Sequence, residues 1–444
     1  MKKIYYLMKL SQASPLRIGN GRSEETDSDL MLDGRGLPFI PGTSLAGVIR
    51  HRAEELIKDK ETLNHLFGVV VPSKSKGKEE LIQSSAILIG DAVLSKSVSK
   101  NDVVIGRRDG VGLGQWETAL GKSKFDFQIA ETKRVFYSVI EWTGNEEDYK
   151  KQIEEIIDPI MRHYVAAGLT IGARTSRGYG RFTVEVKKKS FDFLNNPEKL
   201  KEWIGFNPYN VKEFDSEETL EGESVTTDNI IEINIKMRTP FSVRVRTART
   251  EIMEDGSVPD AVPMENIKGM PVIPGTAWAG AFRHHMHSLL RDIGIQEEDV
   301  EMKQLDAIFG MDGNGQSKIS FSETGIEIEN DSEQKMSVMR TAIDRFTAKP
   351  RNAALFTSVV YTGGRGTLYI TFDKELPNKV RQLIAACICD MNLGLLTIGG
   401  EASVGRGLIS VQDLKYNGDD ITEKMTASQE GAPLNWLKEE GRNA

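Results

Sequence analysis

Residues 37–50 read LPFIPGTSLAGVIR, and residues 270–283 read MPVIPGTAWAGAFR. Each stretch has a short apolar run, a Pro-Gly turn, a threonine, and an arginine eight residues after the glycine. The shared offset and the matched residue types indicate two diverged copies of one module. We expect a helix after each turn with Thr43 or Thr276 as its N-cap, because a threonine hydroxyl can accept a hydrogen bond from the first helical turn.

The order of elements around the two stretches predicts the fold class. Upstream of each Pro-Gly turn lies a predicted half-buried strand: residues 4–14 alternate loosely between apolar and polar, and residues 231–238 alternate strictly. Each copy then has a helix, a strand, a Gly- and Arg-rich hairpin or loop, a strand, a helix and a closing strand. This order is typical of an α+β, ferredoxin-like (RRM-like) module. The expected strands are 4–14, 86–92 and 135–140 in the first copy and 231–238, 319–321 and 367–372 in the second; the hairpins are 105–130 and 338–356, and the later helices lie near 147–167 and 377–393.

Four segments are expected along the chain. Residues 1–186 form the first module and residues 230–416 the second. Between them, residues 187–229 are predicted to be an acidic linker with a short helix near 197–204. Residues 417–444 form a polar C-terminal tail.

Bulk properties narrow the functional class. The 444 residues suffice for two domains with separate cores. No apolar stretch approaches membrane-spanning length, and the N-terminus does not resemble a signal peptide. Cys387 and Cys389 lie in an apolar segment, so we expect buried thiols in a reducing cytoplasm. The net charge of −8 comes from acidic runs in the linker and tail, whereas arginines gather in loops of the modules, which is compatible with an RNA-binding groove.

Matched glycine loops close the two modules. Residues 170–181 read TIGARTSRGYGR, and residues 397–408 read TIGGEASVGRGL. Successive N–H groups of a glycine turn can form a concave anion site, although such a loop can also be a tight structural turn. In the second loop Glu401 replaces Arg174 and Arg406 replaces Tyr179. We therefore expect the two loops to bind RNA unequally.

Taken together, these motifs resemble the CRISPR-associated RAMP superfamily. The resemblance rests on the Pro-Gly helix start, a Phe-Gly at 67–68 and 309–310, the Arg-rich insertion and the closing loop, each present twice. It covers roughly residues 4–185 and 231–415. Residues 340–349 resemble the thumb hairpin of type III effector backbone subunits, and two modules in one chain resemble their fused double-backbone forms.

In that branch, an aspartate in the loop after the first strand cuts target RNA. The resemblance implies that Asp27 and Asp260, each 14 residues before the proline of the Pro-Gly turn, are catalytic. Such a carboxylate can orient a 2′-hydroxyl or weakly hold a hydrated Mg²⁺ or similar divalent cation. The alternative is that both are ordinary turn residues. Asp29 and Asp33 lie in the same first loop, and Asp29 is the residue most easily confused with Asp27.

The resemblance also implies partners and contacts: CRISPR RNA, single-stranded target RNA and other type III effector subunits. Arg50 and Arg283 are expected about one turn into an anion-attracting helix, although either can be a plain surface arginine. Ala46 and Ala279 stand where many relatives carry lysine. The expected RNA-binding residues are Arg50, Arg283, Gly172, Arg174, Arg177, Gly178, Gly180, Arg181, Gly399, Gly405, Arg406, Gly407, Arg108, Arg340 and Arg345.

Three functional hypotheses remain open. The first is an RNA-guided ribonuclease subunit that cuts target RNA at two places. The second is a structural RNA-binding subunit without catalysis. The third is a guide-processing endoribonuclease, which would need a general base such as Tyr179 near a closing loop. His284, His285 and His287 share one predicted helix, but no further ligands at zinc spacing accompany them.

Overall fold

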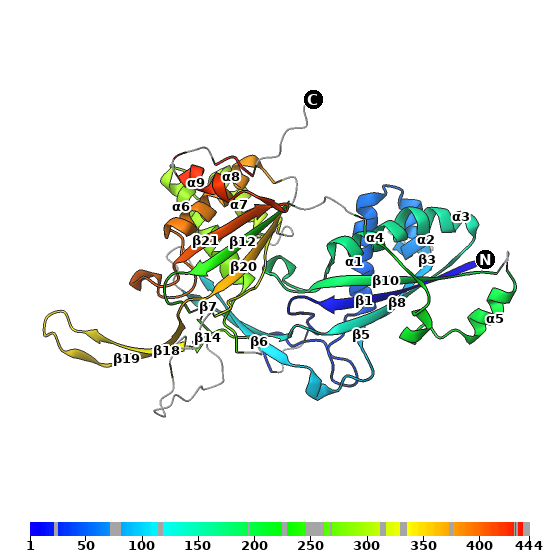
Figure 1. The fold of residues 1–444 in the computed structure, drawn as a ribbon, viewed down its shortest axis with the longest axis horizontal. Coiled ribbons are helices and arrows are strands. Elements are labelled where there is room, and N and C mark those ends of the chain that lie inside the picture. The colour runs from blue at the N-terminus through cyan, green and yellow to red at the C-terminus, as the bar shows by residue number, and fades with distance from the viewer. Residues whose placement is uncertain are drawn as a thin grey trace, which may run out of the picture. The chain divides into compact units, whose positions relative to one another are not determined.

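The computed structural model describes residues 1–444 except 22–24, 72–80, 114–118, 194–195, 224–228, 243, 246–258, 260–261, 267–268, 311–316, 329–334, 373–375, 430, 432–433 and 438–444. The chain forms two compact units. Unit 1 comprises Met1–Gly106, Gln128–Thr175 and Tyr179–Thr226, and unit 2 comprises Arg107–Phe127, Ser176–Gly178 and Thr227–Ala444. The units are described separately below, and Figure 1 labels their elements.

Unit 1 is built on an antiparallel sheet whose central strand is β1 (Lys2–Gln12). β1 pairs with β10 (Arg181–Asp192) on one side and with β8 (Val135–Gly144) on the other. β4 (Ile87–Ile89) pairs with the far side of β8. In chain order the four strands are arranged fourth, first, third, second, which is the ferredoxin-like order. Helices α1 (Gly42–Leu56) and α4 (Asp158–Ala167) connect the strands as the sequence predicts.

Unit 2 repeats this topology. Its central strand β12 (Asn229–Met237) pairs with β21 (Ile409–Tyr416) and with β20 (Arg365–Phe372), and β20 pairs with β16 (Ile319–Phe321). The order is again fourth, first, third, second. Helices α6 (Gly275–Asp292) and α8 (Asn378–Leu393) stand where unit 1 has α1 and α4. The predicted α+β class with two tandem ferredoxin-like modules is confirmed.

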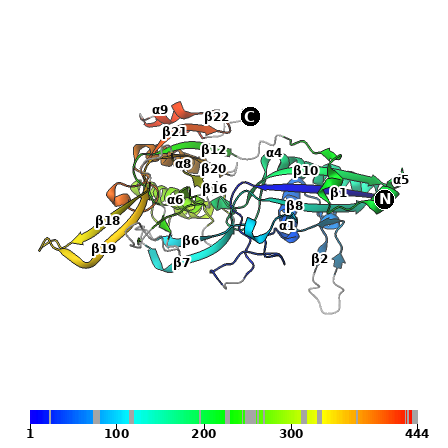
Figure 2. The same ribbon diagram turned by 60° about the horizontal axis from the view of Figure 1, so that its bottom comes forward.

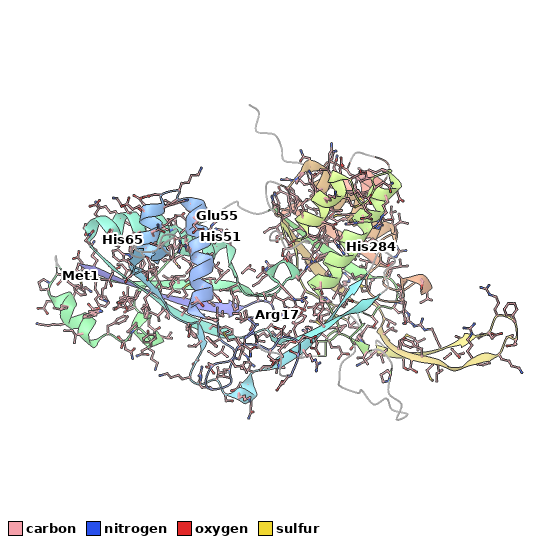
Figure 3. The ribbon with its side chains drawn as sticks, turned by 180° about the vertical axis from the view of Figure 1, so that it is seen from behind. Met1, Arg17, His51, Glu55, His65 and His284 are labelled. Atoms are coloured by element: carbon pink, nitrogen blue, oxygen red, sulfur yellow. The ribbon has the colours of Figure 1, made fainter. Side chains whose placement is uncertain are left out.

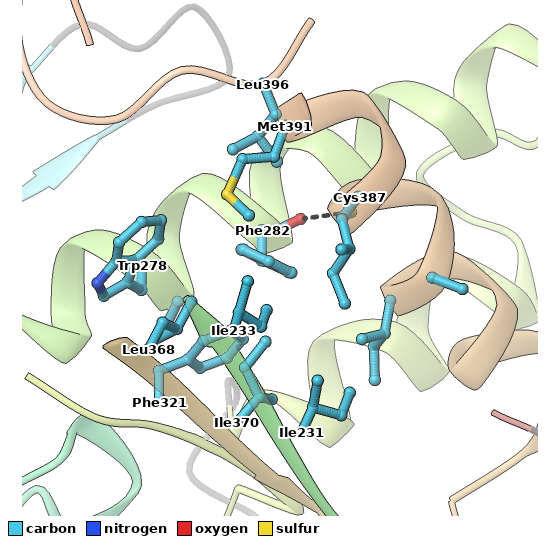
Figure 4. Close-up of a cluster of buried hydrophobic side chains, with 14 of the residues drawn as sticks. Ile231, Ile233, Trp278, Phe282, Phe321, Leu368, Ile370, Cys387, Met391 and Leu396 are labelled. Carbon is cyan, nitrogen blue, oxygen red and sulfur yellow. Dashed lines mark hydrogen bonds between the residues drawn. The ribbon is translucent and has the colours of Figure 1, made fainter. Parts of the chain in front are cut away.

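The core of unit 2 follows from the period-two pattern of its first strand. Ile231, Ile233 and Ile235 are buried, because alternate residues of a strand point to one face. Figure 4 shows this face packed against Trp278 and Phe282 of α6 and against side chains of α8. Both cysteines are buried thiols, as the sequence predicts, and the Cys387 Sγ lies 4.0 Å from the Phe282 carbonyl oxygen.

The segment expected as an acidic linker contributes to unit 1. Its first residues complete β10, and β11 (Glu218–Thr219) pairs with that strand. Helix α5 (Glu198–Gly205) brings Trp203 to the sheet, where its Nε1 donates to the Tyr5 hydroxyl at 2.9 Å. Phe206 and Phe214 pack into the same small cluster. Aromatic side chains thus attach this segment to the face of the sheet.

Both predicted insertions are antiparallel hairpins. In the first half, β6 (Ile105–Leu113) pairs with β7 (Ala119–Ala130). In the second, β18 (Lys335–Ile343) pairs with β19 (Pro350–Tyr361). Figures 1 and 2 show β18–β19 projecting from the sheet of unit 2. Each place predicted to hold a hairpin or loop therefore holds a hairpin.

None of the described helices is long and apolar enough to cross a membrane. The remaining elements are short or peripheral. These elements are α2 (Lys60–Phe67), β2 (Val69–Val71), β3 (Leu81–Gln83), β5 (Val93–Leu94), α3 (Glu146–Asp148), the π-helix Tyr149–Ile157, β9 (Leu169–Thr170), β13 (Arg244–Val245), β14 (Val262–Pro263), β15 (Val272–Ile273), α7 (Val300–Ile308), β17 (Thr324–Gly325), β22 (Asp419–Asp420) and α9 (Thr422–Gln429), with short 3₁₀ turns at Lys100–Asp102, Thr175–Arg177, Val211–Phe214 and Ala402–Val404.

The starts of the two repeated helices differ from the prediction. Helix α1 begins at Gly42 and α6 at Gly275, so their N-caps are Pro41 and Pro274, which provide no side-chain cap. The assignment of Thr43 and Thr276 as N-caps was therefore wrong. In unit 1 the Gly42 N–H instead donates to the carboxylate of Asp91 at 2.7 Å. A distant acidic residue thus takes the place of a local cap.

Candidate nucleic-acid interface

The first acidic loop separates its aspartates by burial. Asp27 is exposed, whereas Asp29 is 7% exposed. The Oδ1 of Asp29 accepts hydrogen bonds from the backbone N–H and the hydroxyl of Thr26, both at 2.9 Å. The Asp29 carboxylate is therefore used to close the turn. Asp27 lies between these two residues with its side chain exposed.

Contacts to the base of the first hairpin hold this loop in place. The Leu30 N–H donates to the Gln128 side-chain oxygen at 3.0 Å, and the Gln128 N–H donates to the Ser28 carbonyl at 3.1 Å. The Gln128 side-chain amide also donates to the Glu25 carboxylate at 2.8 Å. Asp27 is thereby placed on a loop fixed to β7.

Asp33 has a structural role as well. Its Oδ1 accepts from the backbone N–H groups of Arg35 and Leu37 at 2.8 and 3.0 Å. These hydrogen bonds and the ion pair with Arg35 lower the pKa of Asp33 against the opposing effect of burial. Of the three aspartates in this loop, Asp27 is the exposed one.

Asp260 lies outside the described residues, but bridges that follow it keep the register of the first copy. In unit 1, Leu30 bridges Gly19 and Leu32 bridges Pro38. In unit 2, Pro263 pairs with Arg244 and Glu265 bridges Pro271. Pro263 follows Asp260 by three residues, as Leu30 follows Asp27. The described bridges therefore agree with the equivalence expected from the sequence.

The two closing loops have the same backbone. In unit 1 the Ala173 N–H donates to the Arg17 carbonyl at 2.8 Å, and in unit 2 the Gly400 N–H donates to the Ser242 carbonyl at 3.0 Å. The φ angles match at each predicted glycine: 105° and 89° at the first, 86° and 80° at the second, 71° and 75° at the third. These pairs are Gly172 with Gly399, Gly178 with Gly405 and Gly180 with Gly407.

In unit 1 two arginines meet at the closing loop. Arg174 has a left-handed backbone with φ 61°. Its charge acts on Arg17, which is labelled in Figure 3. Burial lowers the pKa of Arg17, and the charge of Arg174 lowers that pKa further. Burial also lowers the pKa of Arg174. Arginine stays protonated in proteins, so two cations from segments distant in the sequence lie close enough to repel each other.

Unit 2 arranges its charges differently. Glu401 takes the position of Arg174, with φ 69°, and forms ion pairs with Arg340 of β18 and Arg406 of the loop. Both arginines also donate to the Ser358 hydroxyl of β19, at 3.2 and 3.4 Å. Arg340 and Arg406, predicted to contact RNA, are thus joined through one carboxylate.

The helix arginines lie farther from the helix starts than expected. Arg50 follows the first residue of α1 by eight positions, roughly 12 Å at 1.5 Å per residue, and the dipole effect fades within one turn. Its Nε donates to Glu54 at 3.0 Å. Arg283 pairs with Asp306 at 3.5 Å. The expected position one turn into each helix was therefore wrong, and both side chains engage neighbouring carboxylates.

The hairpin arginines differ in exposure. Arg108 is 4% exposed and lies 4.0 Å from Glu323, so its predicted role at an RNA surface is not supported by its position. Arg345, by contrast, is exposed near the tip of β18–β19, and the adjacent Phe346 is 93% exposed. An exposed aromatic ring beside cations offers a surface on which a base can stack.

Other predicted groups can be placed as well. Arg177 and Arg181 of the first closing loop are partly exposed. Tyr179 is 1% exposed, which removes it as a general base within reach of a substrate. His285 and His287 bind Asp390 and Asp306 at 2.7 and 3.0 Å. The part of the chain that the structure describes holds no group of three or more His, Cys, Asp or Glu that could bind a metal ion.

The prediction from the sequence missed Arg17 and the role of Glu401. The repeat could have revealed Arg17, because Pro15 and Pro240 both accept a hydrogen bond from the last glycine of a closing loop, and Arg17 and Ser242 follow them by two residues. The contacts among Glu401, Arg340, Arg406 and Ser358 join three segments, the closing loop, β18 and β19, and no local pattern in the sequence encodes them.

Comparison with known proteins agrees with the repeat. A family model described as the RAMP superfamily matches residues 9–183 and 234–410, one match in each half of the chain. A search of curated proteins finds no match.

Proposed function

The chain belongs to the RAMP superfamily, which is associated with CRISPR RNA-binding proteins, and we propose that it is a double-module backbone subunit of a type III CRISPR effector. In this proposal it binds CRISPR RNA in the cytoplasm together with other effector subunits. Asp27 and Asp260 then cleave the complementary target RNA. The observation that carries the proposal is the exposed Asp27 on a loop that Asp29 closes and Gln128 fixes.

The proposed chemistry is an internal transesterification of the target strand. The 2′-hydroxyl oxygen of one nucleotide attacks the adjacent phosphorus, the bond to the 5′-oxygen breaks, and a 2′,3′-cyclic phosphate and a 5′-hydroxyl result. The Asp27 carboxylate orients the attacking hydroxyl and accepts its proton, and a water-borne proton reaches the leaving oxygen.

A divalent cation such as Mg²⁺ fits this loop only as a hydrated, weakly held ion. Mg²⁺ keeps several waters and is often bound through one or two carboxylates plus phosphates of the substrate. Asp27 and Asp260 are the residues that would hold it, each within its own module. Bound there, the ion would stabilise negative charge on the reacting phosphate.

The proposal is tested with the purified full chain in its complex with guide RNA. Changing both Asp27→Asn and Asp260→Asn should abolish cleavage of complementary RNA while guide and target binding persist. Asp33→Asn is the matched control, since Asp33 serves a turn in the same loop. Cleavage by the double variant at the rate of the unmodified protein would establish the alternative, a structural RNA-binding subunit.

The third hypothesis, a guide-processing endoribonuclease, has less support. Residues 169–181 and 396–408, all described, contain no histidine, and Tyr179 is buried. Precursor RNA matured by the isolated chain in the presence of a chelator would restore this hypothesis.

A further inference from the structure

Side chains from both strands of the β18–β19 hairpin meet the closing loop of unit 2. Arg340 comes from β18, Ser358 from β19, and Glu401 and Arg406 from the loop. Glu401 pairs with both arginines, and both arginines donate to the Ser358 hydroxyl. One carboxylate therefore connects the hairpin with the loop.

Because of the burial and the charges in this cluster, loss of the Glu401 carboxylate is energetically costly. The side chains of Glu401 and Arg406 are 8% and 11% exposed, and that of Arg340 is 34% exposed. Two guanidinium groups in such a place repel each other unless an anion lies between them. Removing one partner of a buried ion pair leaves the other charge uncompensated, which is far more destabilising than the loss of an exposed pair.

The cluster is a second attachment of the hairpin to unit 2. At the base of the hairpin, where Lys335 pairs with Tyr361, both side chains bind Glu265, at 2.9 and 2.7 Å. Arg340 lies five residues farther out, roughly 16 Å along an extended strand. A hairpin attached at two separated points cannot pivot about either one.

We infer that Glu401 is a positioning residue that fixes the orientation of the β18–β19 hairpin on the closing loop of unit 2 and, together with the buried Arg406, holds the partly exposed Arg340 ready for an RNA phosphate. The phosphate follows from the charge balance: two guanidinium groups share one carboxylate, and Arg340 keeps an exposed part. The RNA-binding half of this inference rests on the proposed function, whereas the orientation of the hairpin does not.

The orientation is tested without RNA, by single-molecule energy transfer in the full-length protein. Dyes are attached at Ala342→Cys, on the exposed part of the hairpin, and at Lys303→Cys, on the exposed face of α7. The native Cys387 and Cys389 are buried, at 0% and 5% exposure, which limits their labelling. We expect one narrow distance peak in the protein with native Glu401.

Glu401→Gln, which keeps the shape and removes the charge, should broaden this peak, and Glu401→Asp should restore part of it. Arg340→Met should broaden it to the same extent, because it leaves the Glu401–Arg406 pair intact and removes the hairpin's side of the contact. Combining Glu401→Gln with Arg340→Met should add nothing further. Glu232→Gln, which breaks the ion pair with Lys415 on the sheet, should leave the peak unchanged.

A peak that stays narrow in both Glu401→Gln and Arg340→Met overturns the inference, whether or not the chain binds RNA. The RNA-binding half is tested with a labelled uridine homopolymer, for which Glu401→Gln should lower affinity about tenfold through the loss of charge-assisted contacts. Tighter binding with a steeper salt dependence would instead identify Glu401 as a competitor of the phosphate. If the unmodified chain binds neither the homopolymer nor a guide RNA, the proposed function fails while the hairpin result stands.

Discussion

Arg174 and Glu401 occupy the same backbone position in the two closing loops, with φ angles of 61° and 69°, and carry opposite charges. A non-glycine residue at positive φ is uncommon, so its occurrence in both copies supports common descent of the loops. The exchange of charge changes what each loop does. In unit 1 Arg174 adds a second positive charge near Arg17. In unit 2 Glu401 instead forms ion pairs with both Arg340 and Arg406.

The loop of unit 1 should therefore contribute measurably to phosphate binding. Arg17→Gln and Arg174→Gln should each lower the slope of log affinity against log salt for single-stranded RNA by about one, because each removes one phosphate contact. Arg291→Gln, which removes an arginine paired with Glu297 on α6, is the control and should leave the slope unchanged. Equal slopes for all three variants would contradict the assignment of Arg17 and Arg174.

Asp29 should matter for cleavage without touching the substrate. Asp29→Asn places an amide N–H₂ opposite the donors of Thr26 and Glu25, which should destabilise unit 1 by roughly 1–3 kcal/mol. Misplacing Asp27 should slow the cut assigned to the first module tenfold or more, since small displacements of a reacting group are costly. Single-turnover rates should fall at the first site only. An equal fall at both sites would show that Asp29 acts on the complex as a whole.

The last glycines of the closing loops should resist substitution. At Gly180 and Gly407 φ is positive, and a Cβ would overlap the carbonyl oxygen of Ile171 or Ile398. Each change to alanine should cost roughly 1–3 kcal/mol of unfolding free energy in urea titrations. Gly47→Ala is the control: the helical Gly47 has open space around it, so alanine should stabilise α1 by roughly 0.5–1 kcal/mol. Neutral effects at Gly180 and Gly407 would contradict this account of the loop.

His287 should make unit 2 less stable in acid. Burial lowers its pKa from the usual value of 6.5, opposed by Asp306 and Glu297 and assisted by Arg283. Because the folded state binds fewer protons than the unfolded state, this contribution is fully present above pH 6.5 and is lost as the pH falls through the lowered pKa. Thermal unfolding of the full chain between pH 7.5 and 5 should show a smaller loss for His287→Gln than for the unmodified protein. Parallel curves would contradict the assignment.

Much of the fold could be predicted from the sequence, because it rests on local patterns. The alternation in β12 reflects one buried face, and the shared Gly-to-Arg offset indicates that the module is repeated. The burial of Arg108 could not be predicted, since its neighbour Glu323 is remote in the sequence. The same holds for the helix start at Gly42, which depends on Asp91.

The candidate site divides in the same way. The candidate role of Asp27 came from the family resemblance, and its equivalence with Asp260 from counting back from the Pro-Gly turn. The burial that sets Asp29 apart from Asp27 is a property of the folded loop. The equivalence of the closing loops was visible in their glycines. The network of Arg340, Ser358 and Glu401 was not, because it depends on how the hairpin pairs and where it meets the loop.

The most direct test maps the cuts made in a complementary target RNA by the guide-loaded complex of each single variant. We predict that Asp27→Asn removes one cut and Asp260→Asn removes another, while each variant keeps the cut assigned to the other module. If both cuts persist in both variants, or if either variant abolishes both, the account of one acidic residue acting in each module is contradicted.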